Sequence, residues 1–305
     1  MRKSPLSKAS PAFRRHLFEG KIKALVPTPA IICLPSDNLS CVIKIMAEAS
    51  VGALPVVNSE SNIIGIVSER DVVRHLAETR HFDSDAPVAS IMTHSPQSLP
   101  HYASVARAVY FMVAGGYRHL PVTGLTYKDS PTKLGVISIK NVAKYLYQHF
   151  GSKISASVDQ LDAGDDLTQL FSSPLSSLAP HSPITTCVST PVCEVVSLMH
   201  QHHTGSILLT GTEGRLKGIF TERDLITKVL PFAPTKMKSE IHEVMTPRPH
   251  TMTENSTLAL ALSTFAEGKY RHIPVVDDDE NLKGILSLRD FIRALTDEVL
   301  RELGV

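Results

Sequence analysis

The chain has 305 residues, of which 43% are hydrophobic and 20% charged, and its 31 Lys and Arg residues balance 30 Asp and Glu residues. This composition is typical of a soluble globular protein, and the length predicts two domains. A balanced charge gives no reason to expect a nucleic-acid partner, and no stretch has the apolarity of a membrane span. Four cysteines without a C-x-x-C pair favour a reducing compartment, so we expect a cytoplasmic protein.

The chain is predicted to begin with a basic tail at residues 1–11. The first eighteen residues hold no acid and five basic side chains, Arg2, Lys3, Lys8, Arg14 and Arg15. A transit peptide is the alternative, but a basic tail is the commoner case.

From residue 12 onward the sequence repeats itself. A shift of 153 residues places Met46 on Met199, and the run Glu69-Arg70-Asp71 on Glu222-Arg223-Asp224. A weaker shift of 66 places Met46 on Met112. The chain therefore consists of four related units, two in each half.

Each unit is predicted to contain a helix with one apolar face, because its apolar residues follow the i, i+3, i+4, i+7 spacing. The four sets are Leu39, Val42, Ile43, Met46; Val105, Ala108, Val109, Met112; Val192, Val195, Val196, Met199; and Leu258, Ala261, Leu262, Phe265. Two strand-like runs follow each helix, as at 53–57 and 62–67, and a last helix starts near Asp71, Asn141, Asp224 or Asp290.

These elements predict a fold of α/β class (α+β type), with units of strand, helix, strand, strand, helix. One unit has a small core and an exposed sheet face, so we expect the units to pack as tandem pairs. The first pair is predicted at 12–150 and the second at 164–305. A Ser- and Asp-containing stretch at 151–163 is the expected linker.

A polar motif closes the last strand of every unit. It consists of Gly, two apolar residues, Ser or Thr, two further residues, and Asp or Asn. The copies are Gly65-Ile66-Val67-Ser68-Glu69-Arg70-Asp71, Gly135-Val136-Ile137-Ser138-Ile139-Lys140-Asn141, Gly218-Ile219-Phe220-Thr221-Glu222-Arg223-Asp224 and Gly284-Ile285-Leu286-Ser287-Leu288-Arg289-Asp290.

This motif resembles the nucleotide-binding signature of cystathionine-beta-synthase (CBS) domains, and the resemblance covers nearly the whole chain. It implies tandem pairs with clefts that bind adenosine-containing ligands. A layout of four such repeats is similar to that of the gamma subunit of AMP-activated protein kinase.

The chemistry of the motif agrees with this resemblance. A strand that leads into a helix N-terminus presents free backbone N–H groups to an anion. A hydroxyl there can bind a phosphate or sugar oxygen, and an acidic residue can accept from ribose hydroxyls. The predicted binding residues are therefore Ser68, Asp71, Ser138, Asn141, Thr221, Asp224, Ser287 and Asp290. Asn141 replaces the acid of the other copies and provides one acceptor fewer.

A second interpretation of the motif is helix capping, because Ser or Thr followed three residues later by an acid can close a capping box. We weigh it lower for two reasons. The third residue is the short Asp or Asn where a box favours Glu or Gln, and a cap leaves the preceding Gly unexplained.

Two Arg-His pairs distinguish the second and fourth units. Arg118-His119 and Arg271-His272 precede a strand, where the first and third units have Gly52-Ala53 and Gly205-Ser206. By resemblance these pairs face the ligand phosphates, which suits the geometry of Arg. The alternative is a solvated, charged strand start. For Arg70, Lys140, Arg223 and Arg289, a solvated face is the expected setting.

No catalytic constellation is recognisable, and the His200, His202 and His203 cluster is expected to be a polar helix end and no metal site. The sequence therefore predicts a non-catalytic regulatory sensor without a cofactor. It would bind an adenine nucleotide and transmit this to a protein partner or within a homodimer. The alternative is a ligand-free module for protein interaction or dimerisation.

Overall fold

The computed structural model describes residues 11–26, 28–128, 130, 132–159, 166–211, 214–232, 235–268 and 270–302. The predicted tail lies outside these residues except for Pro11, where α1 (Pro11–Glu19) begins. The expected linker at 151–163 is helical as far as Asp159, because α5 continues into it, and 160–163 lie outside the described residues. The division of the chain at this linker stays a prediction.

The first half carries two of the predicted units. Its elements are α1, η1 (Ile22–Leu25), α2 (Leu39–Glu48), β1 (Ala53–Val57), β2 (Ile63–Ser68), α3 (Glu69–Thr79), η2 (Val88–Ser90), β3 (Thr93–His94), β4 (Leu99–Pro100), α4 (Val105–Ala114), β5 (His119–Thr123), β6 (Gly135–Ser138) and α5 (Ile139–Asp159).

The second half repeats this order. Its elements are α6 (Asp166–Ser172), η3 (Leu175–Leu178), β7 (Thr185–Cys187), α7 (Val192–Gln201), β8 (Ser206–Thr210), β9 (Leu216–Thr221), α8 (Glu222–Asp224), the π-helical turn η4 (Leu225–Val229), η5 (Leu230–Phe232), η6 (Thr235–Lys238), η7 (Ile241–Glu243), β10 (Thr246–Pro247), β11 (Met252–Thr253), α9 (Leu258–Glu267), β12 (His272–Val276), β13 (Leu282–Ser287) and α10 (Leu288–Glu302).

Each unit is built on an antiparallel hairpin: β1–β2, β5–β6, β8–β9 and β12–β13. The strand before the first helix of a unit pairs in parallel with its hairpin, as β4 does with β5 and β11 with β12. In addition, β3 pairs with β2 and β10 with β9. We number the four units in chain order as repeats 1 to 4. The segment that leads into repeat 2 or repeat 4 therefore completes the sheet of the repeat before it.

The four amphipathic helices are confirmed, because all sixteen predicted apolar positions on α2, α4, α7 and α9 are buried. Burial of a large aliphatic or aromatic side chain contributes about 1.5–3 kcal/mol. Each of the two apolar cores contains two of these helix faces.

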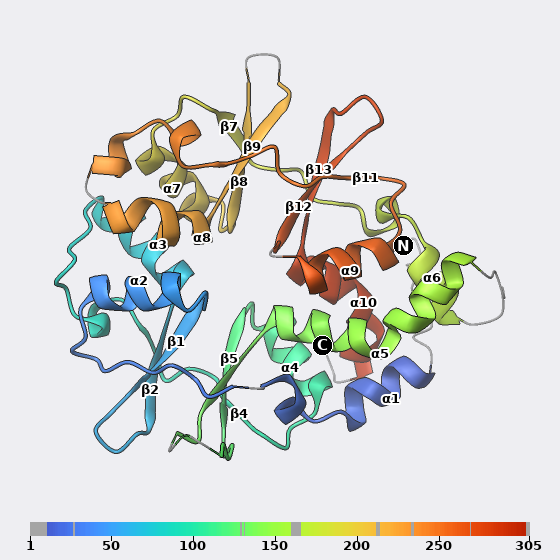
Figure 1. Ribbon diagram of the computed structural model, residues 1–305, viewed down its shortest axis with the longest axis horizontal. Coiled ribbons are helices and arrows are strands. Elements are labelled where there is room, and N and C mark those ends of the chain that lie inside the picture. Colours follow the sequence, from blue (N-terminus) through green and yellow to red (C-terminus); the bar gives the residue numbers. More distant parts are fainter. Residues whose placement is uncertain are drawn as a thin grey trace.

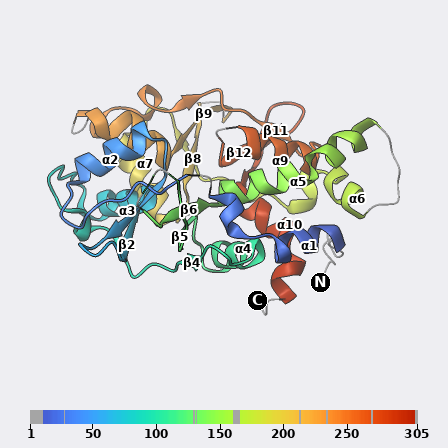
Figure 2. The same ribbon diagram turned by 60° about the horizontal axis from the view of Figure 1, so that its bottom comes forward.

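The apolar cores join the two halves. One core contains α2, α3, α7 and η4, and so combines repeat 1 with repeat 3. The other contains α4, α5, α9 and α10, and combines repeat 2 with repeat 4. Within repeat 4, the ring centroids of Phe265 and Phe291 are 5.5 Å apart. Figure 1 shows the two helix groups on opposite sides of a ring of four hairpins, and Figure 2 shows that the ring is flat.

Within each half, neighbouring repeats exchange their leading segments. The backbone N–H of Ile22 donates to Ala103 O at 2.9 Å, and that of Val88 donates to Asp37 O at 2.8 Å. In the second half, Leu175 N–H donates to Ser256 O at 2.8 Å and Ile241 N–H to Thr190 O at 2.9 Å. Hydrogen bonds thus connect tandem neighbours, and apolar packing is one of the contacts that connect the two halves.

Candidate functional site

Two clefts lie between tandem repeats, and eight of the twelve predicted site residues line them. The first cleft, between repeats 1 and 2, has a volume of about 360 Å³. The second cleft, between repeats 3 and 4, has a volume of about 400 Å³. The first is lined by Ser68, Asp71, Arg118 and His119, and the second by Arg271, His272, Ser287, Asp290 and again Arg118. Ser138, Asn141, Thr221 and Asp224 do not line either cleft.

The motif of repeats 1 and 3 forms a complete helix cap. The Ser68 N–H and Oγ both donate to Asp71 Oδ2, at 2.9 and 2.6 Å, and Thr221 makes the same pair of bonds to Asp224. Both are capping boxes. The expectation that Asp is too short to close a box was wrong, because the hydroxyl and the N–H of the cap residue meet on one carboxylate oxygen.

The second oxygen of these carboxylates is also occupied. Asp71 Oδ1 accepts from Thr93 Oγ1 at 3.1 Å and lies 3.0 Å from Arg74 Nη2. Asp224 Oδ1 is bound in the same way by Thr246 and by Lys228. Asp71 and Asp224 therefore have described partners on both oxygens.

The copies in repeats 2 and 4 are different. Asn141 Oδ1 accepts from Ser138 N–H and Oγ, each at 2.7 Å. Asp290 Oδ2 accepts from Ser287 Oγ, whereas its Oδ1 has only the Nε of Arg289 near it in the described contacts, at 4.0 Å. Its side chain is 23% exposed, against 6% for Asp71. Of the acids in the motif, Asp290 keeps the most acceptor capacity for a ligand.

The glycines of the motif have a packing role. An added Cβ at Gly65 would lie 2.5 Å from Met92 Sδ, and one at Gly218 would collide with Met245. These methionines belong to the segments that cross the hairpins just before β3 and β10. The Gly therefore gives no argument against capping, contrary to our expectation from the sequence.

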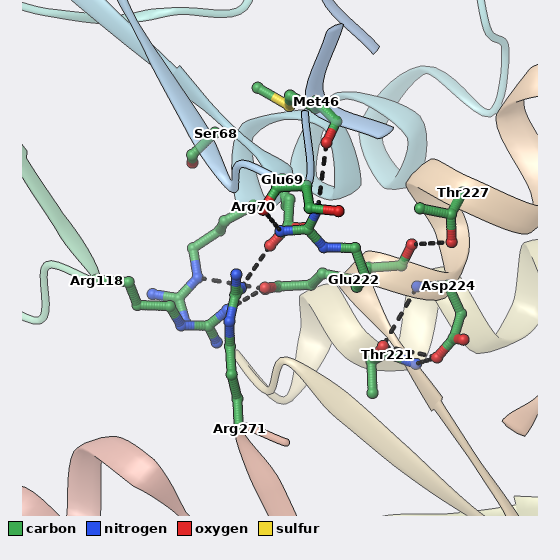
Figure 3. A network of polar contacts seen from close by, with 12 residues as sticks. Met46, Ser68, Glu69, Arg70, Arg118, Thr221, Glu222, Asp224, Thr227 and Arg271 are labelled. Carbon is green, nitrogen blue, oxygen red and sulfur yellow. Dashed lines mark hydrogen bonds and ion pairs between the residues drawn. The ribbon is translucent and has the colours of Figure 1, made fainter. Parts of the chain in front are cut away.

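The arginines at the centre of the ring bind two glutamates from the opposite half of the chain (Figure 3). Glu69 accepts from Arg271 at 2.6 Å and lies 2.6 Å from Arg223, and its side chain is only 2% exposed. Glu222, 4% exposed, is bound by Arg118 and lies 3.7 Å from Arg70. The solvated setting expected for Arg223 was wrong, since it is paired with the buried Glu69, whereas the Arg70 side chain is 41% exposed. Whether Arg118 and Arg271 also contact phosphate stays a prediction.

Glu69 and Glu222 are functional candidates that sequence reasoning missed. Their N–H groups donate to Gly52 O and Gly205 O, at the positions where the even repeats have an Arg. An added Cβ at Gly52 would lie 2.9 Å from Arg271, and one at Gly205 would collide with Arg118. The sequence does contain a signal for these glutamates. Repeats 1 and 3 have Gly and Glu at the two positions where repeats 2 and 4 have Arg and an aliphatic residue.

The two histidines at the centre are held neutral. Burial, followed by the charges of Arg271 and Arg118, lowers the pKa of His119 well below its ordinary value of 6.5. The pKa of His272 is lowered for the same reasons. A neutral imidazole can still donate or accept one hydrogen bond at each nitrogen.

We expect this burial to make stability fall in mild acid. At pH values between the lowered pKa of these histidines and their ordinary pKa of 6.5, the unfolded chain binds more protons than the folded protein does. Stability is therefore full above pH 6.5 and is lost as the pH falls below it. The loss should reach up to about 1.4 kcal/mol per histidine between pH 7.5 and 5.5. Urea unfolding at both pH values measures it. The double substitution His119→Gln, His272→Gln should flatten the dependence, and an unchanged slope would contradict this assignment.

The described residues contain no group of three or more His, Cys, Asp or Glu that could hold a metal ion. The rings of His200 and His203 lie 6.2 Å apart at the end of α7. Within the same part of the chain, no helix has the length and apolarity needed to cross a membrane.

Four hairpin-centred units, with a capped helix at each motif and polar clefts between tandem neighbours, define a protein of four repeats in two tandem pairs. The chain belongs to the CBS domain family, whose model matches residues 22–78, 88–148, 175–231 and 241–297. This confirms the resemblance stated from the motifs, the four repeats and the mixed α and β fold class.

Two proteins illustrate the similarity. Protein MJ1225 of Methanocaldococcus jannaschii, proposed to be an archaeal homologue of g-AMPK, superimposes with a TM-score of 0.71 at 19% identity, over 90% of this chain and 99% of that one. The CBS domain-containing protein CBSCBSPB5 of Arabidopsis thaliana is 24% identical over 294 residues, which are 88% of this chain and 52% of that protein. The chain thus spans about half the length of the curated relatives it matches first.

Proposed function

We propose that this protein is a non-catalytic regulatory sensor that binds adenine nucleotides in the clefts between tandem CBS repeats. The observation that carries the proposal is the second cleft. There the Ser287–Asp290 motif at the N-terminus of α10, which includes Arg289, lines a cleft of about 400 Å³ together with Arg118 and Arg271.

The chemistry of this cleft suits a nucleotide. Asp290 has an oxygen free to accept from ribose hydroxyls, as acids do in dinucleotide sites. The guanidinium groups suit phosphate oxygens, and the start of α10 adds the positive end of a helix dipole. Ile184 and Ile285 supply apolar wall for a base.

The ribose contact gives a direct test of this proposal. Asp290→Asn keeps an acceptor for the Ser287 hydroxyl but removes the charge, so it should leave the melting temperature without ligand almost unchanged. It should weaken AMP by about tenfold or more, which corresponds to about 1.4 kcal/mol. Isothermal titration calorimetry measures the affinity, and 2′-deoxy-AMP should lose little more with the variant, because the lost contacts coincide.

The matched control is Asp71→Asn, which changes the same motif position in repeat 1. Because Asp71 is occupied by Ser68, Thr93 and Arg74, this substitution should lower stability more than Asp290→Asn does. If Asp290→Asn lowered stability as much and left AMP affinity unchanged, Asp290 would be a helix cap alone and the assignment would be wrong.

Transmission to a partner is part of the proposal. The Glu69 and Glu222 pairs connect the two halves at the point where both clefts meet, so a bound phosphate would compete with a carboxylate for Arg118 or Arg271. Such competition would change the ion pairs between the two halves when the ligand binds. A regulatory switch requires that a ligand interact differently with two states of the protein, and this competition would provide such a difference. The partner would be another protein or a second copy of this chain.

The second candidate function is a ligand-free module for protein interaction or dimerisation. The complete caps at Asp71 and Asp224 favour it, since these acids have structural partners without any ligand. The two candidates differ in one measurable property, which is binding of adenine nucleotides.

A further inference from the structure

A cavity away from the two clefts lies between α2 of repeat 1 and η5 of repeat 3, in the helix group at the left of Figure 1. Its volume is about 620 Å³. Its lining comes from three segments, which are α2, residues 81–84 after α3, and η5. None of the described lining residues also lines a cleft. The cavity is therefore separate from the nucleotide site, and both halves of the chain contribute to it.

The wall of the cavity is apolar. Ile43 and Leu230 are buried, and they bring repeat 1 and repeat 3 together at its base. Ala47 and Phe82 are half-buried and pack against the same apolar core. Sites for small organic ligands usually have volumes of about 300–1,000 Å³ and a mostly apolar wall with a few polar groups. The cavity fits this description in both size and lining.

The exposed lining residues carry no net charge. With histidine counted as neutral, they include one base, Lys44, and one acid, Glu48. The Lys44 Nζ and the Glu48 Oε1 lie 3.9 Å apart on α2, so each charge already has a partner. Ser40 and Ser84 supply hydroxyl groups, which can donate or accept a hydrogen bond. These residues favour an uncharged ligand with one or two polar atoms.

The sequence accounts for the open space. The shift of 153 residues that relates the two halves places Ala47 on His200, and it places Ser84 on Met237. In the second half, Met237 packs against the core and η6 lies against α7. There His200 Nε2 lies 4.0 Å from Glu78 Oε1 at the end of α3. Ala and Ser are smaller than His and Met, so the first half leaves open a space that larger side chains occupy in the second half.

We propose that this cavity binds a small, uncharged and largely apolar compound, at a site independent of the nucleotide clefts. A charged ligand would lose its hydration against the apolar wall without gaining an ion partner. An apolar compound would instead cover Ile43, Phe82 and Leu230. Because the lining comes from repeats 1 and 3, the compound contacts both halves of the chain and stabilises their association.

The probe for the test is N-phenyl-1-naphthylamine, an uncharged compound whose fluorescence increases in apolar surroundings. Titrated into the full chain, one equivalent should bind, and a saturating concentration of AMP should not displace it, because the cavity and the clefts share no described lining residue. Absence of binding would overturn the proposal. Displacement by AMP would also overturn it, since the probe would then occupy a cleft.

The double variant Ala47→His, Ser84→Met introduces the side chains of the second half. It should weaken the probe by about tenfold or more, because it covers the apolar surface that the probe buries. Ser84→Met alone, at an exposed position outside the helices, should give a smaller loss and serves if the double variant is unstable. Ala49→His, at the C-cap of α2 and outside the lining, is the matched control and should change the affinity by less than about twofold.

Three results would contradict the proposal. In the first, a double variant that melts as the unaltered protein does binds the probe equally well. In the second, Ala49→His weakens the probe as much as the double variant does. In the third, the affinity for the probe falls as the protein concentration is raised, because a second copy of the chain would then occupy the cavity.

Discussion

Replacing Glu69 by alanine is expected to lower the free energy of unfolding by about 3 kcal/mol, at the lower end of the range for removing one partner of a buried ion pair. The Glu69 carboxylate is 2% exposed and lies 2.6 Å from both Arg223 and Arg271. The pKa of Arg223 is lowered from its ordinary value, chiefly by burial. Glu69 acts against this shift, and the neighbouring Arg271 adds to it. Without the acid, two guanidinium groups would face each other with little water to screen them.

Urea unfolding measures this effect, and Glu78→Ala is the matched control. Glu78 lies on the same helix α3, but its side chain is 56% exposed, so its loss should change stability by less than about 0.5 kcal/mol. In a double-mutant cycle, Arg271→Ala should recover part of the loss caused by Glu69→Ala, because it removes one unpaired charge. A Glu69→Ala variant as stable as Glu78→Ala would show that the central ion pairs do not hold the halves together.

The repeats and their helices could be predicted from the sequence because they are periodic. The apolar spacing that contains Met46, Met112, Met199 and Phe265 recurs in register, and all four side chains are buried where it placed them. Which repeats share a core could not be predicted. All four helices carry the same spacing, so the sequence does not distinguish packing of repeat 1 on repeat 2 from the observed packing on repeat 3.

The sequence located the motifs but not the contacts that their side chains make, and whether they form a ligand site stays a prediction. The motif located Ser68, Asp71, Ser287 and Asp290 at the two clefts. The motif could not show that both carboxylate oxygens of Asp71 have partners whereas one oxygen of Asp290 does not. The second oxygen of Asp71 is bound by Thr93, from the segment that crosses the hairpin, and by Arg74, from the next turn of the helix. Glu69 was overlooked for a similar reason, since its partners are more than 150 residues away in sequence.

Adenine nucleotides are expected to stabilise the protein strongly. At a concentration about a hundredfold above the dissociation constant, a ligand that binds only the folded state adds about 2.7 kcal/mol to the free energy of unfolding. For a protein of this size, that corresponds to a rise of several degrees in melting temperature. The effect should be smaller for the double variant Arg289→Gln, Asp290→Asn, which alters the second cleft alone.

The measurement that tests the central claim most directly is a thermal melt of the unaltered protein with a panel of AMP, ADP, ATP, S-adenosylmethionine and adenosine, each at millimolar concentration. Guanosine and cytidine monophosphates serve as controls for general anion binding. The account predicts a rise of several degrees with at least one phosphorylated adenine nucleotide and a clearly smaller rise with the other bases. If the melting temperature were the same with every adenosine compound as without ligand, the four motifs would be helix caps in a protein-interaction module, and the sensor function would be contradicted.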